Sequence, residues 1–377
     1  MEKKQMKLNA FHLERYFAEH EFTTPYLLCS SDCESMALGE LLALEQGAWE
    51  RFSALGLGYT ESPGHPELRR SIAALYDHIP AQNVLVHSGA EEAIFNFMNV
   101  TLEPGDHVVV HAPYYQSLGE VARGVGAQVS EWRGDPERGW ELDIEVLEKA
   151  LTKQTKAVVV NFPHNPSGFL PDSDLVHQLD RLSERHGFII FSDEVYRGLE
   201  LDPADRLPAL ADINQRAVSL GVMSKTYGLA GLRIGWIATR NERIFQDMAA
   251  FKDYTTICNS APSEFLAQLA LTHAGTIVER NLQIIRDNLH LLDQFFRDHA
   301  DLFDWKRPKA GSIAFPRLLR GAVDALCTDV RDKAGILLLP GTLYADDSNC
   351  FRIGFGRRSL SQAVQRFEEY LRGGRQK

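Results

Sequence analysis

The chain has 377 residues, enough for two domains, and its near-average apolar content and mixed charges are typical of a soluble globular protein. Its formal net charge of -11 argues against nucleic acid or an anionic membrane as partner, and no apolar run approaches membrane-spanning length. Five scattered cysteines lack zinc-site spacing, which predicts a cytoplasmic protein with reduced thiols and no metal site: Cys29, Cys33, Cys258, Cys327 and Cys350.

The first part of the chain predicts helices joined by polar turns. Residues 8–22 carry apolar side chains at roughly helical spacing and predict a short amphipathic helix. Residues 29–35 form a polar loop before a helix expected over 37–54. Residues 59–64 predict a turn, and residues 66–77 predict a further helix.

From there the pattern is regular: an apolar run, a polar or glycine-bearing turn, then in most cases a helix. The runs predict strands at 83–87, 107–111, 157–161, 188–192 and 217–222. Unbroken apolar strands alternating with helices predict an α/β fold with a mostly parallel sheet covered by helices on both faces. Ligands bind outside the carboxyl ends of such strands, and a polar cluster follows each of these runs.

After about residue 275 the pattern changes to a smaller α+β arrangement. A long helix is expected over 276–299, and shorter elements follow at 312–316, 322–334, 336–339, 351–355 and 361–371. We therefore expect a large domain over residues 46–274. A small domain would combine residues 1–45 with residues 275–377.

The segment Ser219–Trp236 contains a lysine of special interest. Lys225 follows a strand-like run and lies among glycines, which favours burial. A buried lysine favours its neutral amine, the form that makes Schiff bases with carbonyls, and Arg233 supplies a charge suited to a phosphate. A carbonyl cofactor that carries a phosphate is pyridoxal 5'-phosphate. The alternative is an ordinary loop lysine.

Other segments support the cofactor interpretation. The chain resembles a fold-type I pyridoxal-phosphate enzyme of the class I/II aminotransferase family over nearly its full length. The matching segments are Tyr59–Gly64, Ser88-Gly89-Ala90-Glu91, Pro113-Tyr114-Tyr115, Asn165-Pro166-Ser167-Gly168, Asp193-Glu194-Val195-Tyr196, Ser224-Lys225 with Arg233, and Arg352. The resemblance implies an aminotransferase-like fold whose large domain binds the cofactor and whose Lys225 holds it as a Schiff base.

The resemblance also implies roles around the cofactor ring. Asp193 resembles the aspartate that faces the pyridine nitrogen and keeps it protonated. Asn165 and Tyr196 resemble the pair that hydrogen-bonds the ring hydroxyl, and Tyr115 resembles the aromatic residue that stacks on the ring. Lys225, Asp193 and Tyr196 are the expected catalytic residues.

A second group of residues is expected at the cofactor phosphate. Ser88, Gly89, Ala90 and Glu91 open a helix whose N–H groups can hold a phosphate, with Ser224 and Arg233 nearby. Tyr59 resembles the residue that reaches the phosphate from the neighbouring subunit, which implies a homodimer with shared active sites. Many relatives carry a hydroxyl three residues before the lysine, where this chain has Val222. Either Ser224 compensates, or the phosphate has one donor fewer.

The substrate side is less fully specified. Arg352 resembles the arginine that grips the substrate carboxylate through two hydrogen bonds, and Asn165 is also expected to bind the substrate. Asp32 and Glu34 stand where many relatives have a glycine-rich loop. They either enter the substrate pocket, where carboxylates would suit a cationic group such as guanidinium, or cap the following helix.

Two enzymatic functions remain open from the sequence. The first is an aminotransferase that moves an amino group between an amino acid and a 2-keto acid. The second is elimination and cyclisation of a hydroxyarginine-like amino acid, because segments such as Val159–Gly168 and Ser224–Arg233 are also similar to capreomycidine synthase-like enzymes. A non-catalytic regulator is disfavoured because Lys225, Asp193 and Asn165 are all present and little chain precedes the first helix.

Overall fold

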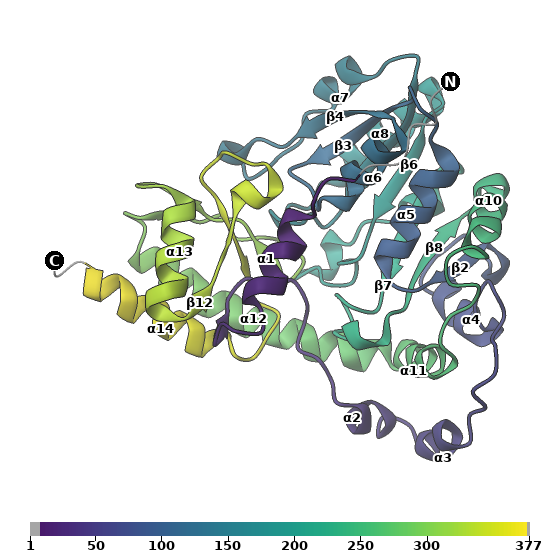
Figure 1. Ribbon diagram of the computed structural model, residues 1–377, viewed down its shortest axis with the longest axis horizontal. Coiled ribbons are helices and arrows are strands. Elements are labelled where there is room, and N and C mark those ends of the chain that lie inside the picture. The colour runs from purple at the N-terminus through teal and green to yellow at the C-terminus, as the bar shows by residue number, and fades with distance from the viewer. Residues whose placement is uncertain (1–7, 375–377) are drawn as a thin grey trace.

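The computed structural model describes residues 8–374 and is built around a seven-stranded sheet (Figure 1). The strand order is β2-β8-β7-β6-β5-β3-β4. All neighbouring pairs from β7 to β4 are parallel, and β8 pairs antiparallel with both of its neighbours. The strands are β2 (Val84–His87), β3 (His107–Ala112), β4 (Gln128–Arg133), β5 (Thr155–Asn161), β6 (Ile189–Asp193), β7 (Val218–Val222) and β8 (Gly235–Thr239). The expected α/β sheet is therefore present, with β4 and β8 as strands that the sequence interpretation missed.

Helices cover both faces of this sheet because its central strands are apolar on both sides. Val108 and Val110 pack in one core with α5 (Ala90–Thr101), α6 (Ser117–Val125) and α10 (Glu242–Lys252). Val109, between them in sequence, packs on the other face with α7 (Ile144–Ala150) and α8 (Ser173–His186). The helices α4 (Pro66–Ala73) and α11 (Ala261–Thr272) cover the β2–β8 end, and α9 (Leu210–Ile213) contacts β7.

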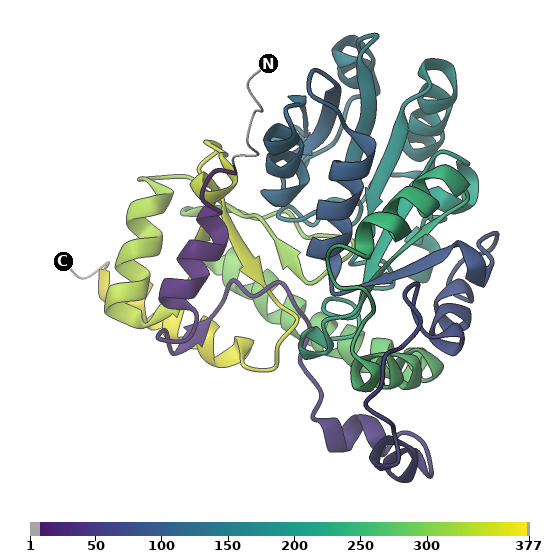
Figure 2. The ribbon, with the colours of Figure 1, turned by 45° about the vertical axis from the view of Figure 1, so that its right-hand side comes forward.

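The second group of elements brings the two ends of the described chain together. Strand β1 (Tyr26–Leu27) pairs in parallel with β12 (Ile336–Leu337), although the paired residues Tyr26 and Ile336 are 310 positions apart. The remaining elements are the helices α12 (Ala274–Asp298), α13 (Val323–Ala334) and α14 (Leu360–Gly374) and the strands β9 (Phe303–Asp304), β10 (Ile313–Ala314), β11 (Arg317–Leu318), β13 (Leu339–Pro340) and β14 (Phe351–Gly354). They lie beside the large sheet in both ribbon views (Figures 1 and 2). On this basis we propose the two-domain division at residues 45 and 275.

Short helical turns occur both among the elements of the large sheet and among those of the second group. Five 3-10 helices occur within residues 8–374: Ala81–Asn83, Pro136–Arg138, Pro203–Asp205, Ala230–Leu232 and Gly341–Tyr344. Within the same range, no helix is long and apolar enough to cross a membrane.

The segment expected as one helix over 37–54 is instead two short helices, α2 (Leu38–Leu42) and α3 (Ala48–Ser53). Gly47 lies between them with a φ of 79°, a left-handed conformation that interrupts a right-handed helix. Figure 1 shows α2 and α3 projecting beyond the rest of the fold. This arm and the chain that leaves it expose Trp49, Leu57 and Tyr59. The N-terminal helix α1 (His12–His20) lies where one was expected.

Candidate active site

A cavity of about 520 Å³ lies at the carboxyl ends of the parallel strands. This size suits a small cofactor together with a substrate. Its lining includes the expected residues Asp32, Ala90, Glu91, Tyr115, Asn165, Asp193, Tyr196, Ser224, Lys225, Arg233 and Arg352. The departure noted from sequence, Val222, also lines it. Residues from seven separated segments thus meet here. Five of these segments follow strands of the large sheet, because the carboxyl ends of parallel strands lie at the same edge. Asp32 and Arg352 come from the second group of elements.

Lys225 follows β7 and points its amine into this cavity. Its Nζ donates a hydrogen bond to the Ser31 hydroxyl over 2.8 Å. Burial lowers the pKa of Lys225, while the nearby Asp32 carboxylate acts in the opposite direction. The amine is therefore more readily neutral than an exposed lysine, as a nucleophile toward carbonyls must be.

Asp193 and Tyr196 place a buried carboxyl and a buried hydroxyl in the cavity. Burial raises the pKa of Asp193 to about 7, and the hydrogen bond from the Val195 N–H to its carboxyl, 3.2 Å long, only partly offsets this. The Tyr196 hydroxyl is buried and has no hydrogen-bond partner within residues 8–374. A buried acid and a buried unpaired hydroxyl in one cavity fit a ligand with a protonated ring nitrogen and a polar ring oxygen. Pyridoxal phosphate has both groups.

Asn165 and Arg352 contact each other in the lining of the cavity. Arg352 is 1% exposed, and its Nε and Nη2 both donate to the Cys29 carbonyl, over 3.0 and 2.8 Å. Its Nη1 donates to Asn165 Oδ1 over 3.2 Å and to the Tyr344 hydroxyl over 2.5 Å. A guanidinium has five N–H donors, so this geometry leaves one on Nη2 for a substrate carboxylate. The two-bond grip expected for Arg352 therefore requires one of its present bonds to be exchanged.

The amino end of α5 has the character of an anion site. Gly89 has a φ of 82°, and a Cβ there would lie 2.4 Å from Arg233 Nη2. Glycine is needed at this position because it lets the guanidinium approach the helix terminus. The Ser88 N–H is already bonded to the Glu92 carboxylate and the Gly89 N–H to the His87 carbonyl. Ala90 and Glu91, which line the cavity, therefore carry the helix-terminus N–H groups that face it.

Helix α1 forms a wall that the sequence interpretation missed. Glu14 and Glu21 line the cavity together with Phe17. The Tyr115 hydroxyl donates to Glu14 Oε1 over 2.7 Å, across 101 positions of sequence. A signal was present, because a spacing of seven places Glu14 and Glu21 near the same face of a helix. That spacing alone does not indicate which part of the fold the face contacts.

The structure separates the two carboxylates for which alternatives were open. Asp32 lines the cavity and receives hydrogen bonds of 3.0 and 2.9 Å from Arg357. Glu34 lies outside the lining, and its Oε2 accepts from the Arg358 N–H instead. Neither residue caps α2, because the Glu40 side chain accepts from the N–H of Ala37 at the start of that helix. The structure therefore places Asp32 in the cavity lining and Glu34 outside it, and places neither residue at the start of α2 as a cap.

Tyr59 does not line this cavity. Its side chain is 92% exposed and follows the projecting arm. Ser88, although next to the amino end of α5, also lies outside the lining.

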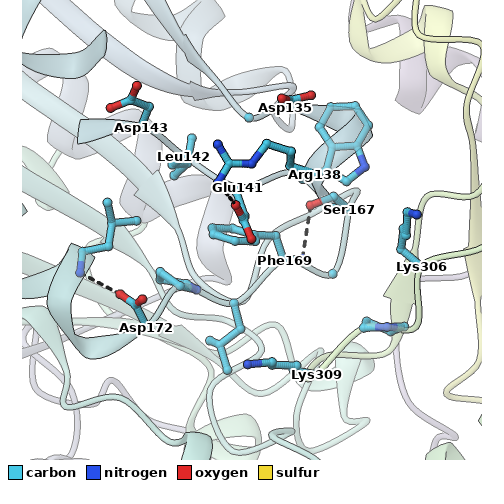
Figure 3. A pocket seen from close by; sticks show the side chains of 18 of the residues that line it. Asp135, Arg138, Glu141, Leu142, Asp143, Ser167, Phe169, Asp172, Lys306 and Lys309 are labelled. Atoms are coloured by element: carbon cyan, nitrogen blue, oxygen red, sulfur yellow. Dashed lines mark hydrogen bonds and ion pairs between the residues drawn. The ribbon is translucent and has the colours of Figure 1, made fainter. Parts of the chain in front are cut away.

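A larger cavity, of about 1070 Å³, lies elsewhere, between α7, α8 and the segment 306–309 (Figure 3). Its acidic side chains already serve local structure: Asp143 and Asp172 accept from backbone N–H groups at the starts of α7 and α8. Arg138 pairs with Glu141 over 2.6 Å. Because these four charges are engaged in this way, and because Lys225 and Asp193 line the smaller cavity, we place the chemistry there.

The family model of class I and II aminotransferases matches residues 52–367. The chain belongs to this family. Its members use pyridoxal phosphate, and the buried carboxyl of Asp193, the unpaired hydroxyl of Tyr196, the amine of Lys225 and the terminus of α5 all fit that cofactor. Pyridoxal phosphate is therefore the cofactor of this aminotransferase-family protein.

The similar proteins include more than one kind of enzyme. Capreomycidine synthase from Streptomyces vinaceus is 30% identical over 372 residues, which cover 97% of this chain and 94% of that protein. Aspartate/prephenate aminotransferase from Thermus thermophilus is 30% identical over 336 residues, 83% of each chain.

Solved structures divide in the same way. A pyridoxal-phosphate-dependent aminotransferase from Streptococcus suis superposes with a TM-score of 0.92 at 30% identity, covering 97% of this chain and 98% of that one. The pyridoxal-phosphate-dependent cyclase OrfR gives a TM-score of 0.88 at 28% identity, covering 99% of this chain and 100% of that one. The family and its fold are thus shared by transferases and a cyclase.

Proposed function

We propose that the protein is an aminotransferase that moves an amino group between an amino acid and a 2-keto acid. The observation that carries this proposal is the meeting of Lys225, Asp193, Tyr196 and Arg352 in one cavity at the strand ends. Together they offer a nucleophilic amine, an acid buried at the cavity wall, a free hydroxyl and a guanidinium.

Each residue has a distinct part in the proposed reaction. When bound, pyridoxal phosphate supplies a carbonyl and an electron-withdrawing ring. The Lys225 amine takes the proton from the substrate alpha carbon and returns it to another atom as general base and acid. The Asp193 carboxylate keeps a proton on the ring nitrogen by charge attraction. Arg352 binds the substrate carboxylate and thereby orients the bond to be broken.

Other residues would hold the cofactor. Arg233 and the amino end of α5 provide charge and N–H donors for its phosphate. Tyr115 offers an aromatic face, and Asn165 offers its Nδ2 amide, for which the structure gives no partner within residues 8–374. We propose that the Ser224 hydroxyl contacts the phosphate in place of the hydroxyl that Val222 lacks, since both residues line the cavity.

We also propose a cytoplasmic homodimer whose subunits complete each other's sites. The projecting arm exposes Trp49 and Leu57, and Tyr254 and Ile257 are exposed as well. Large exposed apolar side chains are typical of contact surfaces. Tyr59, which follows the arm, would reach the phosphate of the partner's cofactor.

The reaction is tested by one turnover without an acceptor. Loaded enzyme is mixed with single amino acids in the absence of any keto acid, and pyridoxamine phosphate is quantified. An aminotransferase yields one equivalent per active site and then stops. Continued turnover without pyridoxamine phosphate would contradict transamination as the main activity.

A second candidate is elimination and cyclisation of a hydroxyarginine-like amino acid. The charges at the far end of the cavity support it. Arg357 is engaged by Asp32 through two hydrogen bonds and so is not free to hold a second substrate carboxylate. Glu21 lines the same cavity, and burial raises its pKa while Arg357 lowers it. Two carboxylates against one guanidinium leave that end negative, which suits a cationic side chain.

This charge argument applies to either reaction and has its own test. Amino acids with basic, neutral and acidic side chains are compared by the spectral change they cause in the bound cofactor, with arginine and hydroxyarginines included. A preference for basic side chains supports the charge argument, and a preference for dicarboxylic amino acids refutes it. Cyclised product without an added keto acid would identify the second candidate.

A further inference from the structure

Tyr344 lies outside the cavity lining yet contacts two residues of the site. It ends the 3-10 helix Gly341–Tyr344, and its ring packs edge-on against Phe315 with ring centroids 6.0 Å apart. Its hydroxyl hydrogen-bonds both Arg352 and Asn165, two residues that are 187 positions apart in the sequence. The sequence pattern assigns no role to this residue.

The hydrogen bonds in this cluster have a defined direction. Arg352 Nη1 can only donate, so the Tyr344 oxygen accepts from it, over 2.5 Å. The Tyr344 proton is then directed to Asn165 Oδ1, 3.1 Å away. Burial raises the pKa of Tyr344 to about 12, so the hydroxyl keeps its proton at neutral pH.

This arrangement fixes the side-chain amide of Asn165. Its Oδ1 accepts from Tyr344 and from Arg352, which occupies both of its lone pairs. The reversed amide would turn an N–H donor toward the Arg352 N–H donor. The amide Nδ2 is therefore the group left to face the cavity, which Asn165 lines.

We propose that Tyr344 is a positioning residue for the cofactor. Its hydroxyl orients Asn165 so that Nδ2 donates to the ring oxygen, and the same hydroxyl links Asn165 by hydrogen bonds to Arg352, which binds the substrate carboxylate in the proposed function. This rests on the proposed function only in requiring the cofactor, and it holds for transamination and for cyclisation alike. A donor on the ring oxygen stabilises the oxygen's ionised form, and this favours loss of the proton from the lysine-bound cofactor.

The test is a pH titration of the visible absorption of the loaded enzyme, comparing wild type with Tyr344→Phe. Phenylalanine keeps the ring against Phe315 and removes only the hydroxyl. We expect the midpoint to move upward by about half a unit to one unit, because Asn165 donates less well. The dissociation constant of pyridoxal phosphate from the apoenzyme should rise about threefold to tenfold.

Two further variants separate orientation from general packing. Tyr370→Phe also removes a tyrosine hydroxyl, one that donates to Asp329 away from the site, and should leave the midpoint unchanged. In an Asn165→Ala background, Tyr344→Phe should cause no additional shift, since the residue through which it acts is absent.

The outcomes distinguish this inference from the proposed function. If wild type binds pyridoxal phosphate and titrates, but Tyr344→Phe titrates at the same pH, the role of Tyr344 is refuted alone. A shift that persists in full in the Asn165→Ala background also refutes it. If wild type neither binds the cofactor nor develops its visible absorption, the proposed function fails. Thermal unfolding of each variant shows whether it is folded, and the apoenzyme binding measurement is independent of turnover.

Discussion

The cofactor-free protein should be destabilised by its own Asp193 at neutral and alkaline pH. Burial raises the pKa of this carboxyl from 3.8 to about 7. A group whose pKa is raised by folding favours the folded state while protonated, and this contribution is lost as pH rises from the unfolded to the folded pKa. A difference of about three units corresponds to roughly 4 kcal/mol, lost between about pH 4 and pH 7.

The assay is urea unfolding of apoenzyme and of its Asp193→Asn variant at fixed protein concentration. The amide removes the ionisation and keeps an oxygen for the Val195 N–H. We expect the difference in unfolding free energy, variant minus wild type, to increase by about 2–4 kcal/mol between pH 5 and pH 8.5. Taking this difference cancels the shared contribution of the other buried acids, such as Glu194.

Pyridoxal phosphate should reverse this behaviour in wild type, because a protonated ring nitrogen would give the carboxylate a charge partner. The reasoning is refuted if wild type and Asp193→Asn show the same dependence of stability on pH without cofactor. Such a result would mean that water or a nearby cation already offsets the free-energy cost of burying the charged Asp193 carboxylate.

Three substitutions test other parts of the site. Asp32→Asn releases Arg357 from its ion pair. The ratio of kcat/KM for basic amino acids to kcat/KM for acidic amino acids should then fall roughly 10–100-fold, as estimated for one charge about 6 Å from the substrate group. An unchanged ratio would show that this end of the cavity does not determine specificity. Gly89→Ala places a methyl group against Arg233, in a backbone conformation that costs a non-glycine residue about 1–3 kcal/mol. The dissociation constant of pyridoxal phosphate should therefore rise about tenfold. Unaltered binding would contradict the assignment of this helix end to the phosphate. Tyr59→Phe should weaken cofactor binding about tenfold or more in the dimer. The stability of the protomer should stay unchanged, because the Tyr59 side chain is exposed. Equal cofactor binding by wild type and variant would argue against a shared site.

The parts of the site that the sequence predicts lie at the ends of apolar strands. Asp193 ends β6 and Lys225 closely follows β7, so the rule that parallel strands end at one edge was sufficient to bring them together. Asn165 follows β5 by the same rule. The order of the strands and the antiparallel β8 were not predicted, because no local pattern encodes which strands are neighbours.

The missed residues reach the site through contacts between distant segments. Glu14 meets Tyr115 and Tyr344 meets Asn165 across 101 and 179 positions, with no periodicity linking either pair. Glu34 lies outside the cavity although Asp32 lines it, because two positions along an irregular loop can face opposite ways. The split of the helix expected over 37–54 depends on the left-handed Gly47.

The central claim is that Lys225 is the attachment point of pyridoxal phosphate. Loaded enzyme is reduced with borohydride, digested, and the peptides are mapped by mass spectrometry. We expect a single modified peptide carrying the reduced cofactor on Lys225, and none after the same treatment of a Lys225→Ala variant. A modification on another lysine, or no modification of enzyme that retains activity, would contradict the account.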